Sequence, residues 1–561
     1  MASIIGKTVG GHTYYYLREV ARVGGKPKVV SQRYLGKAAD IEAAVAGATT
    51  LPDSVAHRSF GDLTAVWGML ERLGVIEIVD DVVGPRRSDA AASVGTYFAL
   101  AAANRVVAPC SKLAFSDWWA TTSGDRLVKL PASALDHRRF WDAMDFISEE
   151  HLVEIERRIV ARLVTSFDVD CSGLVLDMTN FATYIDTAND KAPIAQRGHA
   201  KQKRTDLRLV GLGLVVSTDF GVPLVSRAYP GNRPDVTQFP EVVAELVTRF
   251  GSMAEEGSQL TLVFDAGQDS SDNQELMEGS PLHFVGSLPP SDYPDLLAVP
   301  MRRYRKVDEE RFLGLRAFEA RVEVFGIERR VVVTHSQNLH DKQAQGFEQT
   351  MGKARRQLAE TSARLKRGRG RKPRERVEAE IAQILKPRWL RRVISTTLTG
   401  EEPHELRLVF RTKPKALAEL VTELFGKRIL FTDRDDWGTS EVVAAYRSQS
   451  EVEADFRQMK DPHVVSFSPM FHWTDQKIRV HVAQCVLALM TARLMVRQAA
   501  GAGMQMSVRE LLGALGGIEE SVMLFKGERG RPKARSMLTE MDSVQSHLYD
   551  LFGLEVYAPK S

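Results

Sequence analysis

Between residues 170 and 288, short apolar runs follow one another in an order that few folds can accommodate. Three runs come first, at 172–179, 207–218 and 222–231. Then come a helical segment, a fourth run, a short helical segment and a fifth run, at 237–252, 259–267, 270–278 and 282–288. Three successive strands followed by alternating helix and strand predict an α/β sheet whose strands run in mixed directions.

Other segments show different periodicities. Residues 12–36 predict two strands around a Gly-Gly-Lys-Pro turn, with aromatic and β-branched side chains on one face and Arg and Lys on the other. Such a basic hairpin suits DNA binding, and an ordinary edge hairpin is the alternative. Residues 60–167 favour helices, in which we expect Trp118, Trp119 and Trp141 to anchor the core rather than stack on bases.

Composition limits the class of protein. The chain has 561 residues, 44% hydrophobic and 26% charged, which indicates a globular protein of several domains. Its three cysteines are far apart, so they form neither a disulfide framework nor a CxxC-type zinc site, and they fit a reducing cytosol. The apolar stretch 480–496 contains His481, Gln484 and Arg493, so we expect a buried helix and no membrane span.

The net charge of +3 conceals two basic blocks. Residues 1–37 hold seven Lys and Arg against Glu19, and residues 353–376 hold eleven against Glu360 and Glu375. Separated basic blocks on a nearly neutral chain indicate local contact with a polyanion. A solvated helix face and a loop are the alternative.

Three acidic residues are candidates for chemistry. Asp177 and Asp265 each follow an apolar run, and we expect both at the carboxyl end of a strand, where sites of α/β sheets gather. Glu453 belongs to a predicted helix over 439–460 that can direct its side chain towards them. Converging carboxylates suit Mg²⁺, which takes oxygen ligands and keeps waters for a phosphate. Each acid alone fits a turn or cap equally well.

The segment from Tyr446 to Lys460, YRSQSEVEADFRQMK, resembles the Tyr-x2-Arg-x3-Glu-x6-Lys signature of insertion-sequence DDE transposases. Tyr446, Glu453 and Lys460 match in register, which selects Glu453 rather than Glu451 as the third acid. Gln449 replaces the Arg of the signature, and Arg447 and Arg457 are candidates to take over its contact. Segments 177–186, 197–235 and 263–273 also resemble that family, so the likeness covers roughly 170–495.

This resemblance implies an RNase H-like core, two Mg²⁺ or Mn²⁺ ions held by Asp177, Asp265 and Glu453, and a homodimer that synapses two transposon ends. The implied reaction is cut-and-paste DNA transposition: endonuclease cleavage at terminal inverted repeats, then strand transfer into double-stranded target DNA, in the bacterial cytoplasm. The expected segments are a basic hairpin (1–50), a helical DNA-binding or dimerisation region (51–168), the first part of the catalytic core (169–299), an insertion domain (300–430), the last part of the core (431–500) and a helical tail (501–561).

Several residues are expected to contact DNA phosphates. Tyr446, Glu453 and Lys460 are seven positions apart in each step (453 − 446 and 460 − 453), which places them on one face of a single helix. The other candidates are Arg447, Gln449 and Arg457 on that helix, Arg197, Lys201, Lys203 and Arg204 between the first two strands, and Arg367, Arg369, Arg371 and Lys372 in the insertion. His335, His463 and His472 lack metal-ligand spacing and are expected to be structural.

Two other functions remain open from sequence. A metal-dependent nuclease of the same fold would cleave DNA without a joining step. A domesticated DNA-binding protein would keep the scaffold without catalysis, but its sequence sign is loss of an acid, and all three acids are present.

Overall fold

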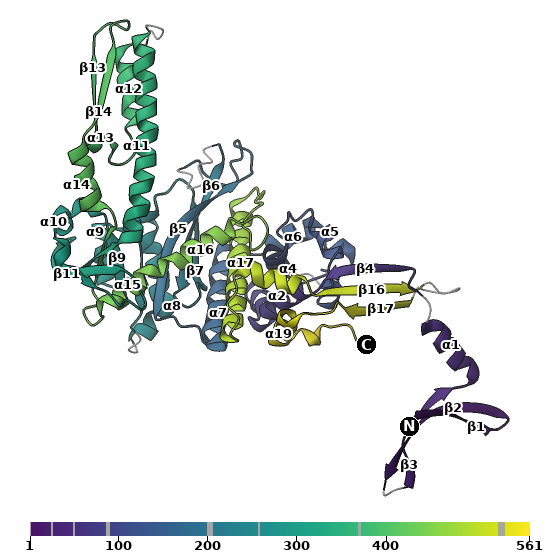
Figure 1. Ribbon diagram of the computed structural model, residues 1–561. Coiled ribbons are helices and arrows are strands. Elements are labelled where there is room, and N and C mark those ends of the chain that lie inside the picture. The colour runs from purple at the N-terminus through teal and green to yellow at the C-terminus, as the bar shows by residue number, and fades with distance from the viewer. Residues whose placement is uncertain are drawn as a thin grey trace.

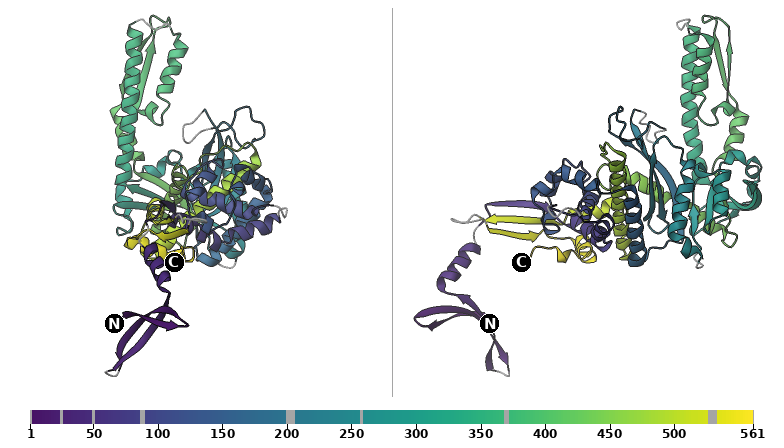
Figure 2. Two further views of the ribbon diagram at one scale, coloured as in Figure 1. Left: turned by 90° about the vertical axis from the view of Figure 1, so that its right-hand side faces the viewer. Right: turned by 180° about the vertical axis from the view of Figure 1, so that it is seen from behind.

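A computed structural model describes residues 2–23, 26–48, 51–85, 90–198, 206–255, 259–367, 372–525 and 533–560. A main body carries a long arm at one end and a small N-terminal sheet that stands away from it at the other (Figures 1 and 2). The body combines a large mixed sheet with helices, so the predicted mixed α/β architecture is confirmed.

The large sheet has nine strands in the order β10-β11-β12-β15-β9-β8-β5-β6-β7. Strands β5, β6 and β7 are antiparallel, β8 is parallel to both β5 and β9, and β9, β15, β12, β11 and β10 are antiparallel again. The strand bounds are Gly173–Thr183 (β5), Arg208–Ser217 (β6), Pro223–Pro230 (β7), Thr261–Val263 (β8), His283–Leu288 (β9), Arg305–Lys306 (β10), Leu315–Val324 (β11), Ile327–Ser336 (β12) and Lys427–Thr432 (β15).

Helices make the crossovers that the parallel strands need. Helix α8 (Phe239–Glu255) connects β7 to β8, and α9 (Ser271–Glu278) connects β8 to β9. Strand β6 is buried over nine of its ten residues, which is why its sequence is a continuous apolar run instead of an alternating one.

The predicted insertion divides into two parts. Strands β10, β11, β12 and β15 extend the large sheet, whereas the segment between β12 and β15 forms the arm (Figure 1). The arm has its own hydrophobic core, which includes Leu358, Val377 and Leu390. Its elements are α11 (Gln337–Lys366), α12 (Arg374–Ile384), α13 (Leu390–Val393), β13 (Ile394–Thr399), β14 (Arg407–Thr412) and α14 (Pro414–Leu424).

The helical region before the sheet forms as predicted. Its helices are α2 (Gly61–Arg72), α3 (Val75–Val83), α4 (Val94–Val107), α5 (Phe115–Ala120), α6 (His137–Met144) and α7 (Glu149–Phe167). Trp119 is buried and Trp118 packs against the core. The expectation for Trp141 was wrong, because its side chain is 41% exposed on the outer side of α6.

The stretch 480–496 lies in α17 (Asp475–Gly501), which packs against α4, α2, α7 and β7. By length and composition it is the one helix among the described residues that could cross a membrane, yet 83% of its most apolar window is buried inside the protein. The predicted buried helix is confirmed.

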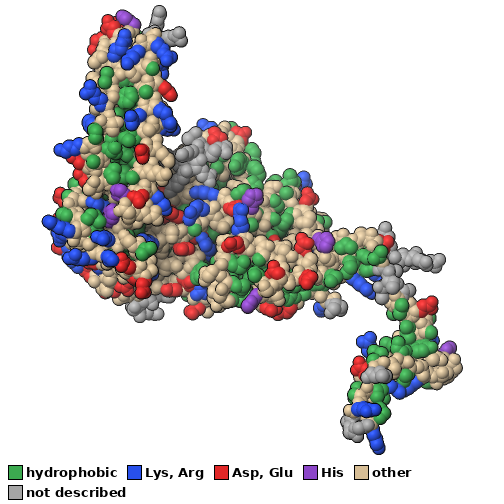
Figure 3. All heavy atoms as spheres, in the orientation of Figure 1, with side chains coloured by type: hydrophobic (Ala, Val, Ile, Leu, Met, Phe, Trp, Pro, Cys, Tyr) green, Lys and Arg blue, Asp and Glu red, His purple; other side chains and the backbone are tan. Residues whose placement is uncertain are grey.

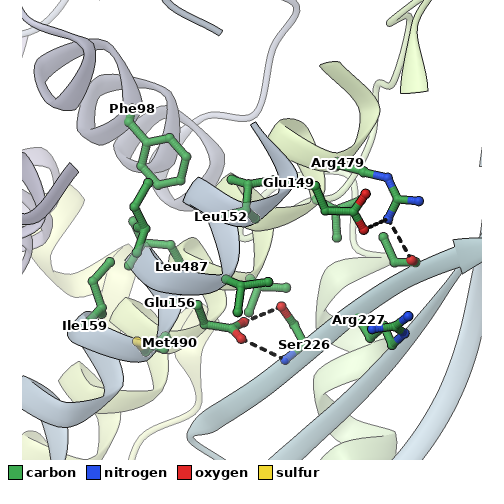
Figure 4. A pocket seen from close by; sticks show the side chains of 16 residues that line it. Phe98, Glu149, Leu152, Glu156, Ile159, Ser226, Arg227, Arg479, Leu487 and Met490 are labelled. Atoms are coloured by element: carbon green, nitrogen blue, oxygen red, sulfur yellow. Dashed lines mark hydrogen bonds and ion pairs between the residues drawn. The ribbon is translucent and has the colours of Figure 1, made fainter. Parts of the chain in front are cut away.

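An apolar pocket marks the junction of α7, β7 and α17 (Figure 4). Its charged groups are paired within the protein: the carboxylate of Glu156 accepts hydrogen bonds from Ser226 and lies 2.7 Å from Arg249, and Arg479 lies 2.9 Å from Glu149. The Glu156 contacts join α7 to β7 and α8 at the edge of the sheet, and the Glu149–Arg479 pair joins α7 to α17.

Both ends of the chain form small sheets. The N-terminal one comprises β1 (Ala2–Val9), β2 (His12–Val23) and β3 (Lys26–Gly36), followed by α1 (Ala38–Ala48), so the predicted hairpin has a third strand. Two lysines that flank the predicted hairpin contact its aromatic rings, so cationic and aromatic side chains mix on this sheet: the Lys7 and Lys37 amines lie 5.3 and 5.8 Å from the ring centres of Tyr16 and Tyr14. Ammonium groups over aromatic rings gain cation–π attraction, which favours this mixture.

The predicted helical tail was wrong in part, because it contains strands as well as helices. Strands β16 (Glu519–Phe525) and β17 (Lys533–Leu538) lie between α18 (Val508–Gly516) and α19 (Ser543–Leu551). Strand β16 pairs with β4 (Ser54–Ser59), so the C-terminal segment returns to the helical region. In the body, a short helix, α10 (Pro294–Leu297), follows β9. The helices α15 (Thr439–Arg447) and α16 (Gln449–Met459), which belong to the candidate site, follow β15.

Candidate active site

Asp177 does not end its strand as predicted. Strand β5 continues six residues further to Thr183, because antiparallel β6 pairs with it over that whole length. On the other side, parallel β8 stops at Val263, opposite Val175. Asp177 therefore lies beside the point where one neighbouring strand leaves the sheet, and its half-buried carboxylate accepts a hydrogen bond of 2.7 Å from the Met178 N–H.

Asp265 lies two residues beyond Val263, as Asp177 lies two beyond Val175. Asp265 keeps an extended backbone (φ −95°, ψ 163°) past the end of β8, and since side chains alternate between the two faces of a sheet, continuing this register puts both aspartates on the same face. Asp265 is exposed, and its Oδ1 accepts hydrogen bonds from the Ser287 hydroxyl at 2.8 Å and from the Tyr446 hydroxyl at 3.4 Å. The predicted position of Asp265 after a strand is confirmed.

The predicted single helix over 439–460 was wrong. Two helices, α15 (Thr439–Arg447) and α16 (Gln449–Met459), meet at Ser448. The Ser448 hydroxyl donates to the carbonyl of Ala445, and such back-bonding bends helices. Tyr446 is therefore on α15, Glu453 on α16, and Lys460 is the C-terminal cap residue of α16.

Glu453 and Asp177 share a hollow. Helix α16 packs on β5 and exposes Glu453, and the hollow between them is lined by Asp177, Met178, Thr179, Glu453, Phe456, Arg457 and Lys460. The Lys460 amine donates to Thr179 Oγ1 at 2.8 Å. Two carboxylates and two cationic side chains thus face one small space on the sheet.

A second hollow lies on the other side of Glu453. Its lining includes Tyr446, Arg447, Gln449, Glu453 and Arg428. Tyr446 is only 7% exposed, and burial, followed by the charge of Asp265, raises the pKa of its hydroxyl. Arg428 Nη1 donates to that hydroxyl at 3.2 Å, so Tyr446 connects the Asp265 carboxylate to a cation.

The three acids border one region, but they do not form a closed cluster. In the part of the chain that the structure describes, no group of three or more Asp, Glu, His or Cys side chains is close enough to hold a metal ion. Asp177 and Glu453 share their hollow, whereas Asp265 is hydrogen-bonded to Ser287 and Tyr446. The joint metal site stays a prediction.

Sequence reasoning missed Asp269. Burial and then the neighbouring Asp265 charge raise the pKa of this carboxyl to about 8. Its Oδ2 is buried with no hydrogen-bond partner among the described residues. The sequence Asp265-Ala266-Gly267-Gln268-Asp269 could have indicated this residue, because a second acid four residues after Asp265 can lie close to it.

Some of the residues predicted to contact DNA phosphates belong to the described part of the chain, and others do not. Lys201, Lys203 and Arg204 lie outside the described residues, as do Arg369 and Arg371, whereas Arg197, Arg367 and Lys372 are exposed. Lys372 is 3.0 Å from Glu380, which also pairs with Arg364. Arg457 and Arg447 are exposed as well, and Gln449 is half-buried.

The histidines expected to be structural have different surroundings. His472 is buried, and burial with the nearby charges of Lys112, Arg105 and Lys477 lowers its pKa to about 3. Burial also lowers the pKa of His335. The backbone N–H of His463 donates to Asp461 Oδ1 at 2.8 Å.

Fold and site together define a mixed α/β protein with an acidic strand edge faced by a helix that carries Glu453. No protein-family model matches this chain, and no curated protein does. Among solved structures, it is similar to a piggyBac transposase synaptic complex with hairpin DNA, with a TM-score of 0.38 and 10% identity over 83% of this chain and 82% of that one.

Proposed function

We propose that this protein is a DDE transposase that cleaves DNA at transposon ends and joins the freed 3′ ends to target DNA. One observation carries the proposal: Asp177 lies on β5, Asp265 lies two residues past the end of the neighbouring parallel strand β8, and Glu453 and Asp177 line the same hollow. These residues are 88 and 188 positions apart in sequence (265 − 177 and 453 − 265), yet they border one region of the molecule, which supports the proposal.

The sheet topology supports an RNase H-like core. Strands β7, β6 and β5 are antiparallel, and β8 and β9 continue the sheet in parallel with β5. This is the plan of three consecutive strands followed by helix–strand alternation that the resemblance implies. Helix α16 then packs on β5, where a third acid can reach the first two.

The donor set suits Mg²⁺ or Mn²⁺, because all three candidate ligands are carboxylates and hard divalent ions prefer oxygen. Asp265 and Glu453 are exposed, and exposed side chains change rotamer within nanoseconds. Turning Asp265 away from Ser287 and Glu453 towards β5 would bring the set together. Bound metal would make a water or a 3′-hydroxyl more nucleophilic and stabilise the departing oxygen.

The chain's own cations have a separate role. Lys460 and Arg457 line the hollow beside Asp177, where they can hold a DNA phosphate next to the carboxylates. Hydrolysis adds a water oxygen to phosphorus and frees the DNA 3′-oxygen. Joining then forms a bond from that 3′-hydroxyl to a target phosphorus and releases the target strand's own 3′-oxygen.

The arm is the proposed site for transposon-end DNA. Lys353, Arg355, Arg356, Lys366 and Arg367 are exposed on or at the end of α11, and Figure 3 shows Lys and Arg side chains along the arm. Phosphate contacts through such side chains give salt-sensitive affinity with little dependence on sequence. Two ends held by two copies would require the proposed homodimer.

The test is strand cleavage and joining on the terminal DNA of the element that encodes this chain, with Mg²⁺. We expect cleaved ends and joined products from the parent protein. We expect losses of at least about a hundredfold from Asp177→Asn, Asp265→Asn and Glu453→Gln, since removal of a residue that only supports a metal ligand already costs about 10–100-fold. Glu451→Gln, two residues from Glu453 on the same helix, is the matched control.

Each rival predicts a different product. Cleavage without joined molecules identifies a nuclease. Binding of the terminal DNA with no strand breaks in Mg²⁺ or Mn²⁺ identifies a non-catalytic DNA-binding protein. Joined products that persist in a folded Asp177→Asn variant would refute the assignment of the acids.

A further inference from the structure

Another cavity, separate from the pocket and the two hollows described above, lies away from the three acids. It forms where α4, α6, α17 and the loops around 108–114 and 461–474 meet. Its volume is about 300 Å³, and its lining includes Arg105, Lys112, Trp141, Phe471, His472 and His481. None of its described lining residues is Asp or Glu. The floor of the cavity is therefore cationic without a carboxylate.

Two cations in this cavity are buried. Arg105 is 2% exposed and Lys112 is 7% exposed. Arg105 donates to the carbonyls of Ser468 and Cys110, which satisfies its hydrogen-bonding groups in part but not its charge. The Lys112 amine is buried with no hydrogen-bond partner among the described residues, and it lies 5.3 Å from the centre of the Phe140 ring.

The neighbouring titratable groups do not balance these charges. Burial and the nearby cations lower the pKa of His472 to about 3 and that of His481 well below its usual value, so both rings are neutral. Burial raises the pKa of the Cys485 thiol to about 12, so it carries no negative charge. Burial and then Arg105 lower the pKa of Lys112 to about 7. An isolated buried charge is costly, and a bound anion would remove that cost.

The rim of the cavity is apolar and aromatic. The exposed fractions are 41% for Trp141, 51% for Phe471 and 72% for Leu113. The His137 ring packs edge-on against Trp141, with ring centres 4.7 Å apart, which holds the indole in place. Exposed aromatic rings beside a cationic floor fit a ligand with a flat ring and an anionic group, since bases stack on aromatic side chains.

We propose that this cavity binds a nucleotide, with its phosphate on the Lys112 amine and its base between Trp141 and Phe471. The nucleotide is either a free mononucleotide or part of a DNA strand. A DNA strand could reach both this cavity and the acids. The Phe471 ring centre lies 5.8 Å from that of Tyr184. Tyr184 is seven residues beyond Asp177 (184 − 177), which is about 23 Å of extended backbone. The binding site itself does not depend on the proposed transposase function.

The experiment is calorimetric titration of the full-length protein with 2′-deoxyadenosine 5′-monophosphate, deoxyadenosine and inorganic phosphate. We expect the monophosphate to bind more tightly than either part alone. Lys112→Met should weaken its binding at least tenfold, about the value of one charge-assisted hydrogen bond. Trp141→Ala should weaken binding of the monophosphate while leaving the affinity for inorganic phosphate unchanged. Lys533→Met, which changes an exposed lysine on β17 outside the arm, and Asp177→Asn should bind the monophosphate as the parent does.

Folding of the Lys112→Met variant is checked by its melting temperature at pH 7. We expect an increase, because an apolar side chain replaces a buried amine that the described residues leave without a hydrogen-bond partner. A folded Lys112→Met protein that binds the monophosphate as the parent does would overturn the proposal. So would a parent protein that shows no binding at millimolar concentrations of any of the three probes or of a 5′-phosphorylated single-stranded oligonucleotide.

The oligonucleotide distinguishes a free mononucleotide from a nucleotide within a DNA strand. Competition between the 5′-phosphorylated strand and the monophosphate, abolished in Lys112→Met, assigns the cavity to a DNA strand. Monophosphate binding without such competition assigns it to a free nucleotide. In both cases Asp177→Asn binds normally, so failure of the transposase assignment and failure of this site give different results.

Discussion

A cation and a second acid lie near Asp265. Arg428 reaches it through the Tyr446 hydroxyl, while Asp269 places a second acid behind it. Clustered carboxylates raise one another's pKa unless a cation is present. A bound metal ion would relieve this repulsion, so the environment of Asp265 fits the proposed role.

Asp269 should make stability depend on pH. Its folded pKa of about 8 lies above its ordinary value of 3.8, so the folded state holds a proton that the unfolded state has lost, and stability falls as pH rises from about 4 to about 8. Asp269→Asn removes this dependence. We expect the variant to melt about 2–4 °C above the parent at pH 8.5 and near the parent's value at pH 4.5, as measured by differential scanning fluorimetry. An equal offset at both pH values would contradict this explanation.

Lys460 should matter through its position in the hollow of Asp177 and Glu453. Lys460→Met removes a cation that we place next to the scissile phosphate. We expect cleavage to fall roughly ten- to a hundredfold, the value of one charge-assisted hydrogen bond, with the melting temperature little changed. Lys533→Met, on β17 outside the arm, is the control for removal of a single surface charge, and equal cleavage rates in the two variants would remove Lys460 from the site.

At the scale of elements, the arm is built as a removable unit. The Ser336 N–H donates to the Gly426 carbonyl at 2.9 Å, so the chain leaves and rejoins the large sheet at adjacent points. Gly426 has a φ of +78°, and a Cβ there would lie 2.8 Å from the Ser336 carbonyl oxygen, so this close return favours glycine. The arm's separate hydrophobic core means that its removal leaves the sheet's core intact.

We therefore expect that replacing residues 339–424 with a short Gly-Ser linker leaves a folded body with weaker DNA binding. Removal of the arm's exposed cations should also flatten the dependence of log affinity on log salt, by about one unit of slope for each phosphate that the arm neutralises. Fluorescence anisotropy with labelled DNA at several salt concentrations measures both quantities. An unchanged slope would show that the arm does not contact DNA.

Sequence patterns predicted much at this scale and missed specific features for physical reasons. The apolar runs located β5 to β9, because burial on both faces of a sheet leaves a clear signature. The break at Ser448 was missed because one serine hydroxyl bends a helix without altering its apolar period. The continuation of β5 past Asp177 was missed because it depends on pairing with β6, which local sequence does not encode. The register of Tyr446, Glu453 and Lys460 was readable, but the burial that raises the pKa of Asp269 depends on the tertiary fold.

At the scale of the whole molecule, the C-terminal segment fastens the helical region. Strand β16 pairs with β4, and Glu520, which is 2% exposed, lies 2.5 Å from Arg126 and accepts a hydrogen bond from Ser123. Burial raises the pKa of Glu520, but the hydrogen bonds from Arg126 and Ser123 outweigh it and bring the pKa to about 2. Strand β4 and the two C-terminal strands thereby lie together on one side of the body, opposite the arm (Figure 1).

Glu520→Ala should loosen this attachment, because it leaves Arg126 without its partner. Removing one member of a buried ion pair costs about 3–5 kcal/mol. We expect a lower melting temperature and faster proteolysis near β16 above pH 5, where the parent's carboxylate is charged in both states. The difference should shrink as pH falls from about 4.5 to about 2, where the folded parent gains the proton. Equal proteolysis rates at neutral pH would contradict a fastening role.

The central claim is that Asp177, Asp265 and Glu453 jointly bind divalent metal. The most direct measurement is Mn²⁺ binding to the full-length protein by electron paramagnetic resonance, for the parent, Asp177→Asn, Asp265→Asn, Glu453→Gln and the control Glu451→Gln. We expect up to two bound ions in the parent and the control, and weakened or abolished binding in each of the other three. Three folded variants that bind Mn²⁺ as the parent does would contradict the claim.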